Sequence, residues 1–125
     1  MRLDEKAREN LEAADRLLST ETDLPLHNAA ASRSYYAAYQ AVADRAQQIG
    51  IAFTGQTADY YRHDSFPSVA RDSQLINDDQ SDELSLLYGL RVKADYMEDQ
   101  VDLDEASGAA DSARRILEAL LGTAL

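Results

Sequence analysis

Two short segments of the chain combine arginines with tyrosines at helical spacing. Residues 33–39 read Arg-Ser-Tyr-Tyr-Ala-Ala-Tyr and hold three of the seven tyrosines, and residues 90–96 read Leu-Arg-Val-Lys-Ala-Asp-Tyr. A guanidinium can hold a phosphate through its paired N–H donors. A phenol adds an apolar ring and one hydroxyl, so the tyrosines serve equally well as packing residues of a helical core. These residue types point to contact with a phosphate or a nucleotide.

The composition excludes most other catalytic chemistry. The chain has no Cys and only two histidines, His27 and His63, which removes thiolate metal sites and most nucleophilic triads. A carboxylate metal site of the Glu-x-x-His kind also fails, because the residues three before the histidines are Leu24 and Tyr60. There is no glycine-rich phosphate loop. We therefore expect no metal and no cofactor.

The charge balance is strongly acidic. The chain carries 23 acidic against 12 basic residues, a net charge of −11. Nucleic-acid binding draws affinity from neutralising phosphates with Lys and Arg, so we expect no DNA-binding surface and no anionic membrane surface, whereas a small arginine-lined groove remains open. The N-terminus turns acidic at once and no apolar run reaches membrane-spanning length, which predicts a cytoplasmic protein.

Helical periodicity positions these segments, and strand patterns are nearly absent. Apolar residues at three- and four-residue steps predict a first helix over about 4–19 and a second over about 28–49, separated by a connector that contains Pro25. In this interpretation Asn28 is the N-cap of the second helix and Gly50 follows its end. Residues 51–63 are predicted to form a loop that folds back on the bundle.

Three further helices are predicted in the second half of the chain. Ser65 is the expected N-cap of a short third helix with Pro67 in its first turn, ending at about 77–80. The fourth helix spans about 81–97, and its Gly89 is a candidate for a close helix crossing. Asp102 and Glu105 form a capping box for the last helix, which Gly122 ends. We expect one domain over residues 1–125, an all-α antiparallel up-and-down bundle of four to five helices.

Three segments in this order resemble the HEPN family: Arg33-Ser34-Tyr35-Tyr36-Ala37-Ala38-Tyr39, then Arg62-His63-Asp64, then Leu90-Arg91-Val92-Lys93-Ala94-Asp95-Tyr96. The resemblance covers nearly the whole chain and is strongest to the small prokaryotic members. It implies a homodimeric helical bundle, often paired with a minimal nucleotidyltransferase as a toxin–antitoxin system. Many members are metal-independent ribonucleases in which a His follows an Arg by four to six residues.

The chain departs from that ribonuclease motif. The residue five positions after Arg91 is Tyr96, and a phenol, with an ordinary pKa near 10, is a poor proton shuttle at neutral pH. The leading hypothesis is a binding and regulatory module whose polar groove recognises a nucleotide or an RNA phosphate. Its candidate ligand-binding residues are Arg33, Tyr36, Tyr39, His63, Arg91, Asp95 and Tyr96.

Two alternatives stay open. One is a divergent ribonuclease toxin in which Arg91, Tyr96 and His63 share the catalysis. The other is a structural bundle that docks a protein partner. Arg33 also has two interpretations, an ion pair with Asp95 inside the bundle or a contact with phosphate.

Overall fold

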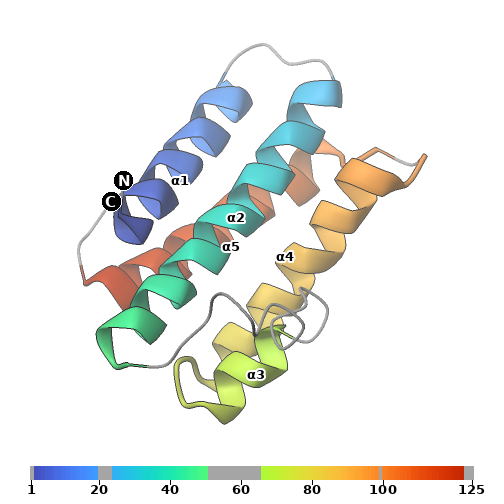
Figure 1. Cartoon of the computed structure of the whole chain (residues 1–125). Coiled ribbons are helices and arrows are strands. Elements are labelled where there is room, and N and C mark those ends of the chain that lie inside the picture. The colour runs from blue at the N-terminus through green and yellow to red at the C-terminus, as the bar shows by residue number, and fades with distance from the viewer. Residues whose placement is uncertain (1, 20–23, 51–65, 99, 123–125) are drawn as a thin grey trace.

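The computed structural model describes residues 2–19, 24–50, 66–98 and 100–122, and the described part of the chain is all α-helix and connections, with no strand. The helices are α1 (Leu3–Ser19), α2 (Leu24–Gln48), α3 (Phe66–Asp72), α4 (Asp78–Tyr96) and α5 (Leu103–Leu121). The long helices α1, α2, α4 and α5 run alternately up and down, so that α1 begins beside the end of α5 (Figure 1). The predicted all-α antiparallel bundle is confirmed.

The second helix lies at the centre of the bundle and packs against α1, α4 and α5 (Figure 1). It can do so because small residues on several of its faces let neighbouring helices approach closely. The fully buried alanines of α2 are Ala30, Ala31, Ala37, Ala38, Ala41 and Ala46. Tyr35 is the large exception, since its side chain is completely buried in the core beside Phe66, Leu84 and Leu87. The site-bearing helix is therefore held on three sides.

The start of α2 differs from the prediction. The helix begins at Leu24, four residues before Asn28, and Pro25 lies in its first turn, where the missing N–H would have no helical partner. Asn28 is therefore not an N-cap. Its Oδ1 instead accepts a hydrogen bond of 2.8 Å from the backbone N–H of Val101, which ties α2 to the connection between α4 and α5.

The fourth helix also starts earlier than predicted, at Asp78. Asn77 is its N-cap: the Asn77 side chain accepts from the Gln80 N–H at 2.8 Å, and the Gln80 side chain accepts from the Asn77 N–H at 2.9 Å. This capping box makes residues 77–80 the start of a helix rather than the end of one. Gly89 does not mark a helix crossing, because nothing lies within 4 Å of a Cβ built on it.

The predicted signals at the other helix ends are confirmed. Asp102 caps α5 in a box with Glu105, and Gly122 ends that helix with a positive φ of 71°. Gly50, just beyond α2, also has a positive φ, of 84°. Pro67 lies in the first turn of α3 as predicted. Ser65 and the predicted loop 51–63 lie outside the described residues.

Ion pairs join helices that are distant in sequence. The Arg114 guanidinium of α5 donates to Asp15 of α1 at 2.6 Å, and Lys93 of α4 donates to Glu105 of α5 at 3.0 Å. These partly exposed pairs lie at the edges of the core and link α1 and α4 to α5. In the described part of the chain, no helix combines the length and the apolarity needed to cross a membrane.

Candidate functional site

The Arg91 side chain of α4 lies among three tyrosine rings. Its guanidinium carbon is 5.8 Å from the ring centroid of Tyr35, 5.3 Å from that of Tyr36 and 5.4 Å from that of Tyr96. Distances below about 6 Å allow a cation–π attraction between the guanidinium and the negative face of a ring. Only 12% of the Arg91 side chain is exposed, so the tyrosines hold this cation in a largely desolvated position.

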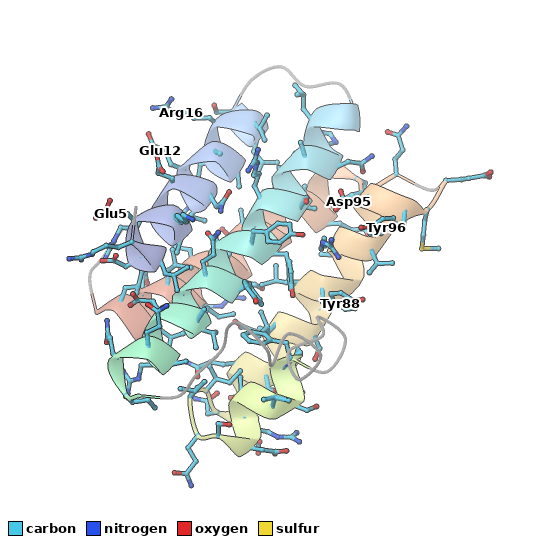
Figure 2. The ribbon with its side chains drawn as sticks, viewed as in Figure 1. Glu5, Glu12, Arg16, Tyr88, Asp95 and Tyr96 are labelled. Carbon is cyan, nitrogen blue, oxygen red and sulfur yellow. The ribbon has the colours of Figure 1, made fainter. Side chains whose placement is uncertain are left out.

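Polar groups from α2 and α4 complete the Arg91 site. Arg91 Nη2 donates to the Tyr96 hydroxyl at 3.3 Å, and Arg91 Nε lies 3.6 Å from Asp95 Oδ2. The same Asp95 oxygen accepts from Ser32 Oγ of α2 at 3.2 Å. Figure 2 shows Asp95 and Tyr96 together near the end of α4. We use the name Arg91 site for Ser32, Tyr36, Arg91, Asp95 and Tyr96.

Local helix geometry explains why these residues meet. Arg91 and Asp95 are four residues apart, so they share a face of α4. Ser32 and Tyr36 are likewise one turn apart on α2. Because α2 and α4 pack together in opposite directions, these two faces come into contact, with Ser32 near Asp95 and Tyr36 near Arg91.

The guanidinium stays charged in this setting. Burial alone would lower the pKa of Arg91, but its interactions with Tyr36, and then with Tyr96 and Asp95, outweigh burial and raise that pKa above its ordinary value. Its buried Nε makes no hydrogen bond with any described residue, since the Asp95 oxygen at 3.6 Å is too far. The site thus holds a positive charge whose Nε is buried inside the protein, on the side of Asp95.

Tyr96 supplies the open side of the site. Its side chain is the most exposed large apolar group of the described residues, at 71%. The Tyr96 hydroxyl accepts a hydrogen bond from Arg91, while much of the Tyr96 ring remains in contact with solvent. A cation beside an exposed aromatic ring can bind a phosphate and stack a base.

Tyr39, another predicted ligand residue, lies away from Tyr96. Its ring centroid is 4.6 Å from that of Phe66 in α3 and 6.1 Å from that of Tyr35. Burial raises the pKa of the Tyr39 hydroxyl, as it does for the fully buried Tyr35. Tyr39 is therefore partly buried and packs against the core, with its ring beside Phe66 of α3.

Arg33 lies on a different face of α2 from the Arg91 site. Its Nη1 donates to Asn10 Oδ1 of α1 at 3.2 Å, and Asn10 in turn donates to Gln40 at 2.7 Å. Arg33 lines a cleft of about 380 Å³ between α1 and α2, whereas Asp95 contacts Arg91 and Ser32. The structure does not pair Arg33 with Asp95, and it does not bring Arg33 together with Arg91 in one groove.

Three further points concern His63, Ser32 and possible metal ligands. His63 lies outside the described residues. Ser32 was absent from the predicted set, although its one-turn spacing from Tyr36 was a usable signal. Among the described residues, no three His, Cys, Asp or Glu side chains gather where they could hold a metal ion.

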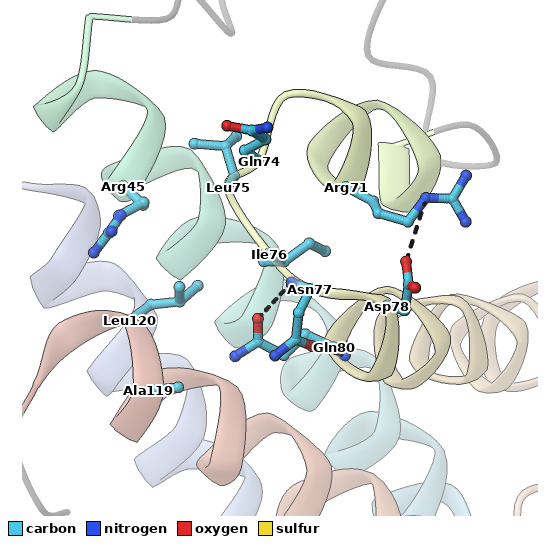
Figure 3. Close-up of a pocket in the computed structure, with 10 residues that line it drawn as sticks. All are labelled: Arg45, Arg71, Gln74, Leu75, Ile76, Asn77, Asp78, Gln80, Ala119 and Leu120. Atoms are coloured by element: carbon cyan, nitrogen blue, oxygen red, sulfur yellow. Dashed lines mark hydrogen bonds and ion pairs between the residues drawn. The ribbon is translucent and has the colours of Figure 1, made fainter.

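A separate cavity of about 490 Å³ lies where the end of α2, the connection from α3 to α4 and the end of α5 meet (Figure 3). Most of its polar groups already have partners: Asn77 and Gln80 form the cap of α4, and Arg71 lies 3.9 Å from Asp78. The Arg91 site, with its guanidinium charge and the exposed ring of Tyr96, is the stronger candidate for a ligand site.

Comparison with models of protein families identifies the family of this chain. The family model described as HEPN domain matches residues 1–123 of the chain. Neither the comparison with curated proteins nor that with solved structures found a match.

Proposed function

Since this chain belongs to the HEPN domain family, we propose that it is a helical binding and regulatory module whose Arg91 site recognises the phosphate of a nucleotide or of RNA. One observation carries the proposal: a guanidinium enclosed by tyrosines lies beside an exposed aromatic ring. The guanidinium would hold the phosphate, and Tyr96 would stack the base, a contact that contributes about 1–3 kcal/mol per base in comparable sites.

The residues of the Arg91 site favour a module that binds a nucleotide or RNA without cleaving it efficiently. An imidazole is the side chain that gains and loses protons most readily near neutral pH. The described part of the Arg91 site holds no imidazole, and Tyr96 occupies the position where ribonuclease members of the family would carry His. Among its described residues the site therefore has a cation that can hold a phosphate and no side chain that readily transfers protons near neutral pH.

Calorimetric titration with AMP, ATP and a short single-stranded RNA tests the proposal. Arg91→Met removes the charge and keeps an apolar stem, and should weaken binding about tenfold or more, because a charge-assisted contact is lost. Arg33→Met is the matched control, since it makes the same change on another face of α2. Equal losses in both variants would refute the assignment to Arg91, and absence of any binding heat would favour the purely structural bundle.

The ribonuclease alternative has its own test. The purified chain is incubated with structured RNA in EDTA beside Arg91→Met. Cleavage by the native chain that disappears in Arg91→Met would replace the binding module with the divergent ribonuclease. Cleavage of equal extent in both samples would indicate a contaminating nuclease.

We also propose that the chain acts as a homodimer with a nucleotidyltransferase partner, in a system of toxin–antitoxin type. The support for this is the family resemblance of the Arg33–Tyr39 and Leu90–Tyr96 segments. Sedimentation equilibrium tests the dimer. Co-expression with a small nucleotidyltransferase encoded next to this gene tests the pairing, with co-purification and growth rescue as the expected results.

A further inference from the structure

The outer side of α4 and α5 carries an apolar groove that the Arg91 site does not use. The groove has a volume of about 390 Å³, and its floor is formed by Leu86, Leu87, Leu90, Gly108 and Ala109. Leu86 is 62% exposed, which is unusual for a leucine in the middle of a helix. We name these five residues the α4–α5 groove.

Gly108 is an exposed residue of the groove lining. No heavy atom lies within 4 Å of a Cβ built on this residue, so the glycine leaves open space on the surface of α5. A glycine inside a helix costs stability relative to alanine, and neither a positive φ nor a close neighbour requires it here. An apolar side chain from another molecule can therefore approach the backbone of α5 at this point.

The rim of the groove is acidic. Asp104, Glu105, Asp111 and Arg115 line it; Glu105 is paired with Lys93 at 3.0 Å, and Arg115 with Glu83 at 3.1 Å. Asp104 and Asp111 have no ion-pair partner among the described residues. Asp104 lies in the first turn of α5, and Asp111 interacts electrostatically with Arg114 without a close ion pair. Three carboxylates against one guanidinium leave the rim with a net negative charge beside the apolar residues.

We propose that the α4–α5 groove docks an amphipathic helix of a partner protein, one that carries basic residues beside its apolar stripe. The floor would bury apolar side chains at helical spacing, as in other helix-in-groove complexes. Asp104 and Arg115 are eleven residues apart on α5, so the groove matches about 17 Å, or three turns, of a partner helix.

Charge decides between a foreign helix and a second copy of this chain. A second copy using the same groove would bring its own acidic rim and its own net charge of −11 to the contact. Like charges facing each other disfavour that contact, whereas Lys or Arg flanking an apolar stripe would meet Asp104 and Asp111.

Peptide binding measured by fluorescence anisotropy at 0.15 M salt tests this inference. The probe is an 18-residue helical peptide with a leucine stripe and flanking lysines; one control replaces lysine by glutamate, and another scrambles the leucines. The basic stripe peptide should bind. The acidic and scrambled peptides should bind about tenfold more weakly or worse, because each loses one of the two complementary features.

Protein variants locate the contact. Leu86→Ser removes an apolar contact and Gly108→Met places a large side chain in the groove, and each should weaken binding of the basic peptide about tenfold. Ile49→Ser is the matched control, since Ile49 is 52% exposed at the end of α2, away from the groove. Asp104→Asn with Asp111→Asn should weaken binding more than Glu9→Gln with Glu12→Gln, which removes the same charge from α1.

Three outcomes would overturn the proposal: no binding of the basic peptide, equal binding to all the variants, or a dimer in sedimentation equilibrium that Leu86→Ser dissociates. The last would make the second copy the occupant of the groove. Leu86→Ser should leave AMP binding at the Arg91 site unchanged, so failure of this inference and failure of the proposed function can be told apart.

Discussion

Replacing Asp95 by asparagine is expected to tighten phosphate binding at the Arg91 site. The Asp95 carboxylate lies 3.6 Å from Arg91 Nε and competes with any anion for the same positive charge. Asparagine keeps an oxygen that can accept from Ser32 Oγ, as Asp95 does at 3.2 Å, so the contact between α2 and α4 is retained. Asp95→Asn therefore removes a charge that repels an anionic ligand and keeps an acceptor for Ser32 Oγ.

The size of the effect follows from the geometry. A phosphate oxygen about 3 Å beyond the guanidinium would lie about 7 Å from Asp95, and two unit charges at that distance interact by about 1 kcal/mol at an effective dielectric constant of about 40. This corresponds to about fivefold tighter binding per ligand charge. The lost ion pair should cost less than about 1 kcal/mol of folding stability, because the Asp95 side chain is one-third exposed.

The assay is calorimetric titration of AMP into native protein, Asp95→Asn and Asp82→Asn at 0.05 and 0.3 M salt. Asp82→Asn makes the same change of net charge thirteen residues away on α4, about 20 Å along the helix. Only Asp95→Asn should tighten binding strongly, and the gain should shrink at high salt. Weaker binding by Asp95→Asn would refute the reasoning, because it would mean that the carboxylate accepts a hydrogen bond from the ligand.

Three further predictions concern stability and are checked by urea unfolding. Gly89→Ala should raise the free energy of unfolding by about 0.5–1 kcal/mol, since nothing lies within 4 Å of the new Cβ; a loss would mean a hidden contact. Asn28→Ala should cost about 1–3 kcal/mol by leaving the buried Val101 N–H without its acceptor, and Asn28→Asp, which keeps an acceptor, should cost less; equal costs would contradict this role. Burial, and then Asp4, raise the pKa of Asp44, so its ionisation penalises the folded state above that pKa and not below about pH 4. Asp44→Asn should therefore be stabilising at pH 7 and neutral at pH 3, and an equal gain at both pH values would contradict the assignment.

The sequence predicts a helix end correctly where all the residues that form the cap lie within about one turn of each other. The Asp102 box and the positive φ of Gly122 are of this kind, because each depends on backbone groups a few residues away. The start of α4 was missed although it has the same chemistry. Asn77 and Gln80 form a capping box, but the acidic residues between them resembled a connector.

The start of α2 was missed for a different reason. Pro25 looked like part of a connector, and Asn28 had the residue type of an N-cap. The partner that gives Asn28 its role, the Val101 N–H, lies 73 residues away in the chain. No local pattern contains that information.

In the candidate site, too, some contacts can be predicted from the sequence and others depend on helix packing. The types and spacing of Arg91, Asp95 and Tyr96 were readable from one helix, since their contacts within α4 follow from helical geometry. The separation of Arg33 from Arg91 was not readable. It depends on the packing of α1 against α2, which places Asn10 beside Arg33 and leaves Tyr36 to face α4.

By itself, the sequence determined the all-α bundle, the family resemblance and the missing histidine, because helical periodicity, capping residues and motif spacing are all local properties. Only the tertiary structure decided which polar residues share a site. That choice depends on which faces of α2 meet α1 and α4, and the burial of many small side chains at once sets those faces. The arginine that acts as a candidate ligand group is the one that this packing surrounds with tyrosines.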